Sequence, residues 1–302
     1  MDRKWDELDM DCLINIFERL ELQELILGVA FVCKSWYRAS VSPQCWKTLN
    51  FDKLNFAPSS SPFVTTFCHQ YAIHNFSVCG FLTLALSRGG PAVVELILPA
   101  ICTLEKLIYA SNMCPCLRVL GLPMHIVKHN NSIDLFSDEE MTQFLGLFNK
   151  WKDLEYLHLR EYQSYTREVL LAIKLHCKNF VGIKKIGLMG DDEASAIAAV
   201  LPGLKQLTVT SSATPALMIR ESLKEILEGC RELEVLVIND CCGFEVDEEI
   251  LKMTSHIRSF LYKDVRPNVD EDYYPLAIIF NPDTWKHSGI DLGLGMDNLG
   301  LN

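Results

Sequence analysis

Cysteine and histidine side chains gather in one short stretch of the sequence, where they could act as zinc ligands. Cys114 and Cys116 are followed by His125 and His129. Closed zinc fingers usually separate their paired cysteines by two or more residues and leave a longer connection before the histidines. The intervening segment, 117–122, has the pattern of a strand, which would hold the cysteines and histidines at opposite ends. We therefore expect no metal site here.

Nucleophilic catalysis by a cysteine would need a histidine to activate the thiol and a further group to orient that histidine. With 12 cysteines and 8 histidines, chance pairs are unavoidable, and no local signature accompanies any of them. Carboxylate runs such as Asp191-Asp192 and Asp247-Glu248-Glu249 are better explained as helix N-termini, where the macrodipole favours negative charge. No glycine pattern that cradles phosphate is present. The sequence predicts no catalytic residue and no cofactor.

The bulk composition excludes further classes of function. The chain has 302 residues, of which 49% are hydrophobic and 22% are charged, as expected for an ordered globular protein. Its formal net charge of −11 would repel a phosphate backbone, so nucleic acid is not an expected partner. We find no secretory signal and no apolar run long enough to cross a membrane. We expect the protein in the cytoplasm, the nucleus or both, with its cysteines as buried thiols.

Residues 5–46 have the spacing of short amphipathic helices. Apolar side chains recur every three or four residues, which places them on one helical face. Asp9 is a suitable N-cap for the first helix. About forty residues cannot hide so many apolar groups in their own core, so some must face another surface. The apolar residues of the first helix and its flanks are Leu8, Cys12, Leu13, Ile16, Phe17 and Leu20.

This segment resembles the F-box family. The resemblance rests on Leu8, the run 13–20, Trp46 and above all the element Val32-Cys33-Lys34-Ser35-Trp36. The family usually opens with Leu-Pro, whereas Leu8 is followed by Asp9. The opening 5–8 resembles a plant subgroup that continues into leucine-rich repeats. The resemblance implies docking on a Skp-type adaptor through helices against a groove. The residues assigned to that contact are Leu8, Leu13, Ile16, Phe17, Leu20, Val32, Cys33 and Trp36.

Beyond residue 90 the sequence repeats an L-x-x-L-x-L pattern, often preceded by Cys, Trp or Leu. Successive copies begin about 27 residues apart on average, which is typical of a leucine-rich repeat with one strand and one helix per unit. The copies are Leu117/Leu120/Leu122, Leu154/Leu157/Leu159, Ile183/Ile186/Leu188, Leu204/Leu207/Val209 and Leu233/Leu236/Ile238, with weaker ones at Val93/Leu96/Leu98 and Ile257/Phe260/Tyr262.

Helices are expected between these strands. Ser137 and Glu140 form a predicted capping box, and Asp191 opens an alanine-rich helix that can pack closely. Thr214-Pro215 predicts the start of another helix, with Gly229 at its end. The polar stretch 125–134 is expected to be a loop. The segment 52–90 indicates only one irregular early repeat.

The predicted fold class is α/β: an N-terminal three-helix F-box followed by a curved leucine-rich-repeat solenoid with a parallel sheet. We expect an F-box domain at 1–50, the solenoid at 51–263 and a partly disordered acidic tail at 264–302. Outward side chains between the buried leucines would contact a protein substrate. They include Arg118, Glu155, Lys184, Lys185, Lys205 and Val235, and the residues chosen as substrate-binding are Tyr156, His158, Lys184, Lys205, Thr208 and Glu234.

These features together predict a non-catalytic subunit of an SCF-type (Skp–Cullin–F-box) ubiquitin ligase. Its expected partners are a Skp-type adaptor, through it a Cullin–RING ligase, and an unknown protein substrate. The chain would act by holding its substrate close to the ubiquitin donor. The alternative is a protein-interaction scaffold that never meets a ligase, and a weaker one is a thiol- or metal-dependent enzyme.

Overall fold

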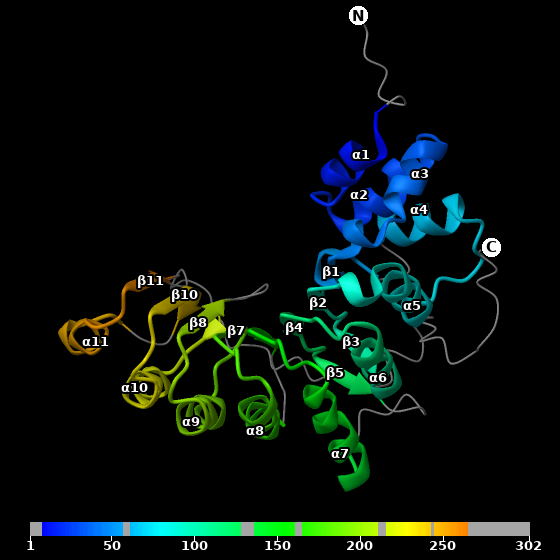
Figure 1. Ribbon diagram of the computed structural model, residues 1–302. Coiled ribbons are helices and arrows are strands. Elements are labelled where there is room, and N and C mark those ends of the chain that lie inside the picture. Colours follow the sequence, from blue (N-terminus) through cyan, green and yellow to red (C-terminus); the bar gives the residue numbers. More distant parts are fainter. Residues whose placement is uncertain are drawn as a thin grey trace, which may run out of the picture. The chain divides into compact units, whose positions relative to one another are not determined.

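The computed structural model describes residues 8–56, 61–127, 136–160, 165–210, 216–242 and 245–264 (Figure 1). Contacts divide these residues into two units. The first unit contains the described residues up to 117 together with 126–127. The second contains 118–125 and the described residues from 136 onward.

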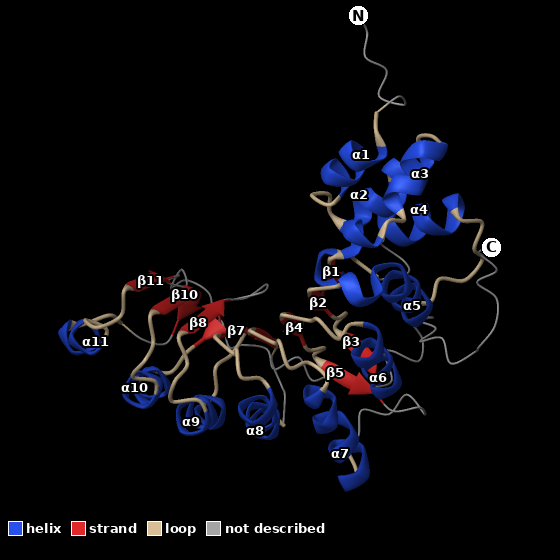
Figure 2. Cartoon of the chain, in the orientation of Figure 1, coloured by secondary structure: helices blue, strands red, loops and turns tan. Residues whose placement is uncertain are grey.

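The first unit begins with three short helices, as the sequence predicts. They are α1 (Met10–Phe17), α2 (Leu22–Leu27) and α3 (Lys34–Ser40), and Figure 2 shows them gathered beside α4. The Asp9 carboxylate accepts a hydrogen bond from the Asp11 backbone N–H at 2.9 Å, so the predicted N-cap is confirmed. Two further turns, 29–31 and 43–46, are 3₁₀ helices that complete this region.

The first parallel strand follows directly after the N-terminal helices. In β1 (Thr48–Asn50), Leu49 lies opposite Leu96 of β2 (Glu95–Ile97), and both leucines are fully buried. The segment between the two strands, for which the sequence indicated only one irregular early repeat, forms α4 (Pro62–Gln70) and α5 (Val78–Gly89). Aromatic rings fill the space around these helices: Phe51, Phe56, Phe63, Phe67, Phe76 and Phe81.

The end of the first unit corrects one loop prediction. Strand β3 (Ile101–Thr103) leads into α6 (Leu104–Met113) and pairs with β5 (His125–Val127). Residues 125–127, expected in a loop, are therefore a strand, and Ile126 and Val127 are buried. Burial of these two apolar side chains outweighs the polar character of the residues that follow them.

The second unit alternates strands and helices, and its strands are parallel (Figure 2). Within this unit the strands lie side by side in the order β4, β6, β7, β8, β10, β11, and the short β9 pairs with β10. Figure 1 shows α8 to α11 along one face of these strands. The strands are β4 (Val119–Gly121), β6 (Tyr156–Leu159), β7 (Gly182–Ile186), β8 (Gln206–Thr210), β9 (Ala216–Leu217), β10 (Val235–Cys242) and β11 (Ser259–Asp264), and the helices are α7 (Asp138–Gly146), α8 (Thr166–His176), α9 (Asp191–Val200), α10 (Arg220–Gly229) and α11 (Glu248–Met253).

The inward side chains of the strands form one continuous apolar row, as the repeat pattern predicts. Side chains alternate between the two faces of a strand, so every second residue points toward the helices. The backbone register aligns the inward residues of neighbouring strands, and each of them is 2% exposed or less. The row consists of Leu120, Leu157, Ile183, Leu207 and Leu236.

One repeat copy lies three residues away from its predicted register. Ile183 was predicted as the first apolar residue of its copy, but it pairs with Leu157 and Leu207 and is therefore the second. The predicted outward position of Lys185 is wrong for the same reason. Lys185 lies opposite Leu159 and Val209 and is only 1% exposed. An ionic group occupies a position that is apolar in the neighbouring repeats.

The prediction of buried thiols is confirmed for the repeat cysteines Cys114 and Cys230 and holds also for Cys177, but it is wrong for Cys12 and Cys116, which are exposed. The Cys177 thiol donates to the Trp151 carbonyl oxygen at 3.3 Å. The Cys230 thiol donates to the Leu201 carbonyl oxygen at 3.6 Å. In each case the acceptor precedes the strand of the neighbouring repeat. The thiols act as small apolar groups with a weak hydrogen bond.

The starts of α7 and α9, each of which has a local capping hydrogen bond, were predicted correctly. The start of α10, which has no side-chain cap, was not. Ser137 and Glu140 form the capping box of α7, and Asp191 begins α9. Helix α10 begins at Arg220, later than expected, while Thr214 and Pro215 lie outside the described residues. Its predicted end at Gly229 is confirmed. Of the predicted tail, only Asp264 is described, as the end of β11.

Candidate functional site

The N-terminal helices hold an aromatic core. Leu13 and Phe17 lie four residues apart on the inner face of α1 and are 0% and 1% exposed. The Phe17 ring meets the Trp36 ring edge-on, with centroids 5.2 Å apart. Trp46 is fully buried, and its indole N–H donates to the Ser40 carbonyl oxygen at 2.7 Å. These side chains hold the three helices together.

A second set of apolar side chains in the same region faces outward. Ile16 on α1 is 42% exposed, and Val32 before α3 is 59% exposed. Leu8, Leu20, Cys33 and Trp36 are half-buried. The structure thus separates the eight residues that the resemblance assigned to adaptor contact: Leu13 and Phe17 are interior, and Ile16 and Val32 are accessible. A contiguous patch of exposed apolar side chains is a feature of protein-binding surfaces, and Ile16 and Val32 are the accessible apolar members of this set.

Sequence reasoning missed three exposed apolar residues of this region. Met10, Phe31 and Tyr37 are 37%, 48% and 47% exposed. Phe31 and Tyr37 flank the Val32-to-Trp36 element on either side, so adjacency to that element was the available signal. We call the exposed residues Met10, Ile16, Phe31, Val32 and Tyr37 the apolar F-box surface.

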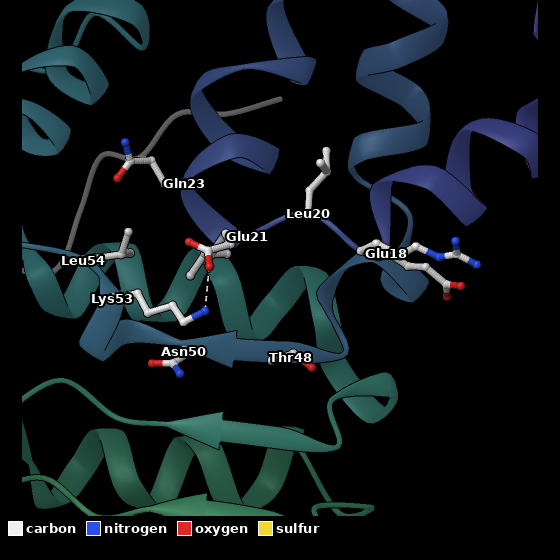
Figure 3. A pocket seen from close by; sticks show the side chains of 10 residues that line it. Glu18, Leu20, Glu21, Gln23, Thr48, Asn50, Lys53 and Leu54 are labelled. Carbon is white, nitrogen blue, oxygen red and sulfur yellow. Dashed lines mark hydrogen bonds and ion pairs between the residues drawn. The ribbon is translucent and has the colours of Figure 1, made fainter.

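A pocket of about 290 Å³ lies where the α1–α2 connection passes over β1 (Figure 3). Both carboxylates of its lining form ion pairs within the chain. The Glu21 carboxylate lies 2.6 Å from the Lys53 ammonium, as the dashed line in Figure 3 shows. Glu18 forms a second ion pair with Lys47 at 3.1 Å. The pocket therefore marks a polar junction between the N-terminal helices and the first strand.

The second unit presents the open face of its sheet, opposite the helices. Four of the six residues chosen as substrate-binding lie on it: Tyr156, His158, Lys184 and Thr208, all half-buried. The register brings three of them into one row, with His158 opposite Lys184 and Lys184 opposite Thr208. Adjacent strands are about 4.8 Å apart, so these three side chains are neighbours.

The Tyr156 ring lies across the next position of the sheet. A Cβ atom placed on Gly182, its neighbour on β7, would come within 2.9 Å of the Tyr156 ring and 3.0 Å of the Gln206 Cβ. Only glycine leaves room for the ring in that position. The ring thus lies over Gly182, beside the row of His158 and Lys184.

Electrostatics keep His158 neutral. Burial, with a smaller contribution from the positive charge of Lys184, lowers the pKa of His158 to about 4. At neutral pH the imidazole therefore carries one donor and one acceptor nitrogen and no charge. Nearby, burial also lowers the pKa of Arg160, although the guanidinium stays charged, and its Nε–H donates to the Leu122 carbonyl oxygen at 3.2 Å.

The other two chosen substrate residues lie at the edge where the strands begin. Lys205 and Glu234 precede β8 and β10 and pair with each other at 3.8 Å. Arg258 also contacts Glu234, at 3.4 Å. Arg118 and Glu155 make a similar pair at this edge. The charges of these residues are matched by ion pairs within the chain. On the open face, by contrast, Lys184 forms no ion pair with a described residue.

Metal-binding and thiol chemistry find little support in the described part of the chain. No group of three or more His, Cys, Asp or Glu side chains is arranged there to hold a metal ion. Cys114 is buried and Cys116 is exposed, while His129 lies outside the described residues. Burial raises the pKa of Cys177 and Cys230 to about 11, so both remain protonated and poorly nucleophilic. None of the described helices is long and apolar enough to cross a membrane.

Comparison with known proteins agrees with this arrangement. Residues 10–52 match the F-box-like family. The chain is 28% identical to an F-box/LRR-repeat protein of Arabidopsis thaliana, over 86% of this chain and 84% of that protein. It is 25% identical to the F-box protein FBW2 over 83% of this chain and 72% of that protein, and 26% identical to the F-box protein SKIP1 over 78% and 79%, both also from Arabidopsis thaliana.

The N-terminal region is therefore an F-box-like domain. The chain has homologues among the F-box/LRR-repeat proteins of Arabidopsis thaliana over most of its length. The resemblance noted in the sequence is confirmed. So is the predicted fold class, because an F-box-like region precedes repeats whose strands form a parallel sheet.

Proposed function

We propose that this chain is the substrate-recognition subunit of an SCF-type E3 ubiquitin ligase. Its F-box-like domain would bind a Skp-type adaptor and through it a Cullin–RING ligase, in the cytoplasm, the nucleus or both. Its leucine-rich repeats would recruit target proteins for ubiquitination and degradation. The observation that carries the proposal is the accessibility of Ile16 and Val32 in a domain whose core is already filled.

The proposed adaptor contact uses surface helices against an apolar groove. Ile16 and Val32 would contact the adaptor directly, with the half-buried Leu8, Leu20, Cys33 and Trp36 at the margin. Leu13 and Phe17 would act indirectly, because their burial fixes the angle between α1 and α3. We propose 1–50, 51–263 and 264–302 as the F-box, the repeats and the tail.

The proposed mechanism needs no catalytic group from this chain. Holding a substrate close to a charged ubiquitin-conjugating enzyme replaces a bimolecular encounter by a local one, which raises the effective concentration of the reacting groups. The high pKa of the buried cysteines agrees with a binding role, because protonated thiols are weak nucleophiles.

Co-purification with a Skp-type adaptor tests the proposal. The full chain is expected to bind the adaptor, and the single variants Ile16→Asp and Val32→Asp are expected to weaken binding at least tenfold, or about 1.4 kcal/mol. A carboxylate there would be desolvated against an apolar groove. Both residues are exposed, so the variants should keep the circular dichroism spectrum and thermal midpoint of the wild type.

Leu175→Asp is the matched control. Leu175 lies on α8 and is 64% exposed, so the same chemical change is made on another surface. It should leave adaptor binding unchanged. If the folded wild type binds no Skp-type adaptor that is offered, the ligase role is rejected and the interaction scaffold becomes the leading explanation. Equal losses in all three variants would instead show that a non-specific effect of charge is responsible.

A further inference from the structure

The open face of the sheet in the second unit differs in charge from the protein as a whole. The chain has a formal net charge of −11. Yet strands β4, β6, β7 and β8 contain no Asp or Glu at all. Their outward side chains are neutral except for Lys184. Glu155 and Glu234 lie at the edge where the strands begin, and the carboxylates within strands of this unit, Asp240 and Asp264, belong to β10 and β11.

The two adjacent lysines of β7 have opposite environments. The Lys185 ammonium points inward and lies 2.6 Å from the Glu193 carboxylate, so its charge is matched. Lys184 points to the open face and is half-buried. Among the described residues, no carboxylate lies within ion-pair distance of its ammonium. A cation that is partly removed from water and has no counter-ion is a site where an anion is favoured.

Two neutral hydrogen-bonding groups flank this cation in the register of the sheet. His158 on β6 and Thr208 on β8 lie directly opposite Lys184. His158 is neutral at physiological pH, so the row offers one positive charge between an imidazole and a hydroxyl. A carboxylate carries one charge and accepts several hydrogen bonds, which matches this set. A phosphate group carries nearly two charges and would be better matched by two cations.

We propose that Lys184 anchors an acidic side chain, Asp or Glu, of the target protein, with His158 and Thr208 completing the contact. The inference rests on the proposed function and names the kind of segment that the repeats recruit. The Tyr156 ring lies next to this row, pressed against Gly182. The Tyr156 ring supplies an aromatic surface on which an apolar residue next to the acidic residue of the target protein can pack.

A library of displayed random 12-residue peptides, selected on the purified full chain, tests the inference. The wild type should enrich peptides with Asp or Glu near an apolar residue. Lys184→Glu should lose that enrichment and favour Lys or Arg instead. Lys174→Glu, an equal charge change at an exposed position of α8, should select like the wild type. Because selection needs no adaptor, its result is independent of whether the F-box-like domain binds one.

A double-mutant cycle on one selected peptide sharpens the test. Replacing the acidic residue of the peptide by its amide, or Lys184 by Ala, should each weaken binding roughly tenfold, and the two losses should not add. Binding of the acidic peptide should also raise the pKa of His158, followed by NMR of its ring protons, because a carboxylate favours the imidazolium.

Three outcomes would overturn the inference. The first is a wild-type selection without acidic enrichment. The second is additive losses in the cycle, which would show that the acidic residue and Lys184 do not meet. The third is a phosphoserine peptide that binds at least tenfold more tightly than its glutamate counterpart, since that would make phosphate the preferred anion.

Discussion

Lys185 shows how a single residue can break the rule of a repeat and still fit the fold. It occupies an inward position that is Leu159 in one neighbouring strand and Val209 in the other. Its ammonium donates to the Arg160 carbonyl oxygen at 2.8 Å and to the Glu193 carboxylate at 2.6 Å. These bonds offset the cost of removing the charge from water, which an apolar interior alone would not do.

Removing one partner of this pair should destabilise the second unit strongly. Lys185→Met keeps the volume of the side chain but leaves Glu193 without its counter-ion at a position only 16% exposed. We expect the free energy of unfolding to fall by about 3 kcal/mol. Urea denaturation followed by circular dichroism measures the change, with the slope of the transition expected to stay constant.

Lys205→Met is the control for Lys185→Met. Lys205 and Glu234 are both well exposed and 3.8 Å apart, so the loss should stay below about 1 kcal/mol. A double variant Lys185→Met/Glu193→Leu should recover part of the stability, because no charge is then left unmatched. Equal effects of Lys185→Met and Lys205→Met would show that burial of the pair does not matter.

The consecutive lysines also show where sequence reasoning fails at this scale. Successive residues of a strand point to opposite faces, so one of Lys184 and Lys185 had to point inward. The apolar pattern placed Ile183, Ile186 and Leu188 in the core, which turned both lysines outward. The pattern recognises only apolar residues. A buried lysine that is paired with a carboxylate is therefore not recognised as an inward residue, and the register inferred from the pattern is displaced. The partner of Lys185, Glu193, lies on the following helix and gives no local signal.

At the level of elements, helix starts were predictable where the cap is a short-range interaction. Asp9, Ser137 and Asp247 each accept a backbone N–H within three residues. Asp9 and Ser137 were predicted as caps, and Asp247 was predicted only as one of the negative charges at a helix N-terminus. Helices α4 and α5 were missed as elements. They are arranged around phenylalanines from distant parts of the chain, such as Phe51 and Phe81, and contacts of this kind leave no periodic trace.

The contact between α9 and α10 depends on small residues at one crossing point. A Cβ atom at Gly229 would lie 2.5 Å from the Ala198 Cβ, far inside van der Waals contact. Gly229→Ala should therefore push the two helices apart and lower the free energy of unfolding by about 1–3 kcal/mol. Urea denaturation measures the loss, although alanine is the better helix former.

Gly146→Ala provides the matched comparison at the end of α7. A Cβ atom at Gly146 would meet no atom within 4 Å, and its backbone is already helical. This substitution should leave the stability unchanged or raise it by up to about 1 kcal/mol, because alanine loses less backbone entropy on folding. If both substitutions stabilise the protein, α9 and α10 do not approach each other as closely at Gly229 and Ala198 as the structure shows.

At the scale of the whole molecule, the predicted order of F-box and repeats was correct, but the first boundary cuts through a shared core. Leu25, Ile26 and Trp46 of the F-box-like region are 1% exposed or less. The Tyr71 hydroxyl, just after α4, donates to the Ile26 carbonyl oxygen at 3.0 Å. The Arg88 guanidinium of α5 lies 4.9 Å from the centre of the Trp46 ring. The sequence could not show this, because the contacts join residues more than forty positions apart.

Removing residues 1–47 should therefore unfold more than the F-box-like region. Without Ile26 and Trp46, the inner faces of α4 and α5 lose apolar partners that are fully buried in the full chain. We expect amide protons of 62–89 to lose their protection in hydrogen exchange, while those of β7, β8 and β10 keep it. Hydrogen exchange with mass spectrometry, on the full chain and on the truncated chain, measures both regions in one experiment.

The point variant Ile16→Asp is the control that separates binding from folding. It removes an exposed side chain of the apolar F-box surface and leaves Leu25, Ile26 and Trp46 in place, so protection of α4 and α5 should match the wild type. If the truncated chain keeps that protection as well, the F-box-like region is an independent domain, and its contacts with α4 and α5 do not contribute to the stability of these two helices. If both variants lose it, Ile16 supports the fold and loss of adaptor binding by Ile16→Asp could not be assigned to a direct contact.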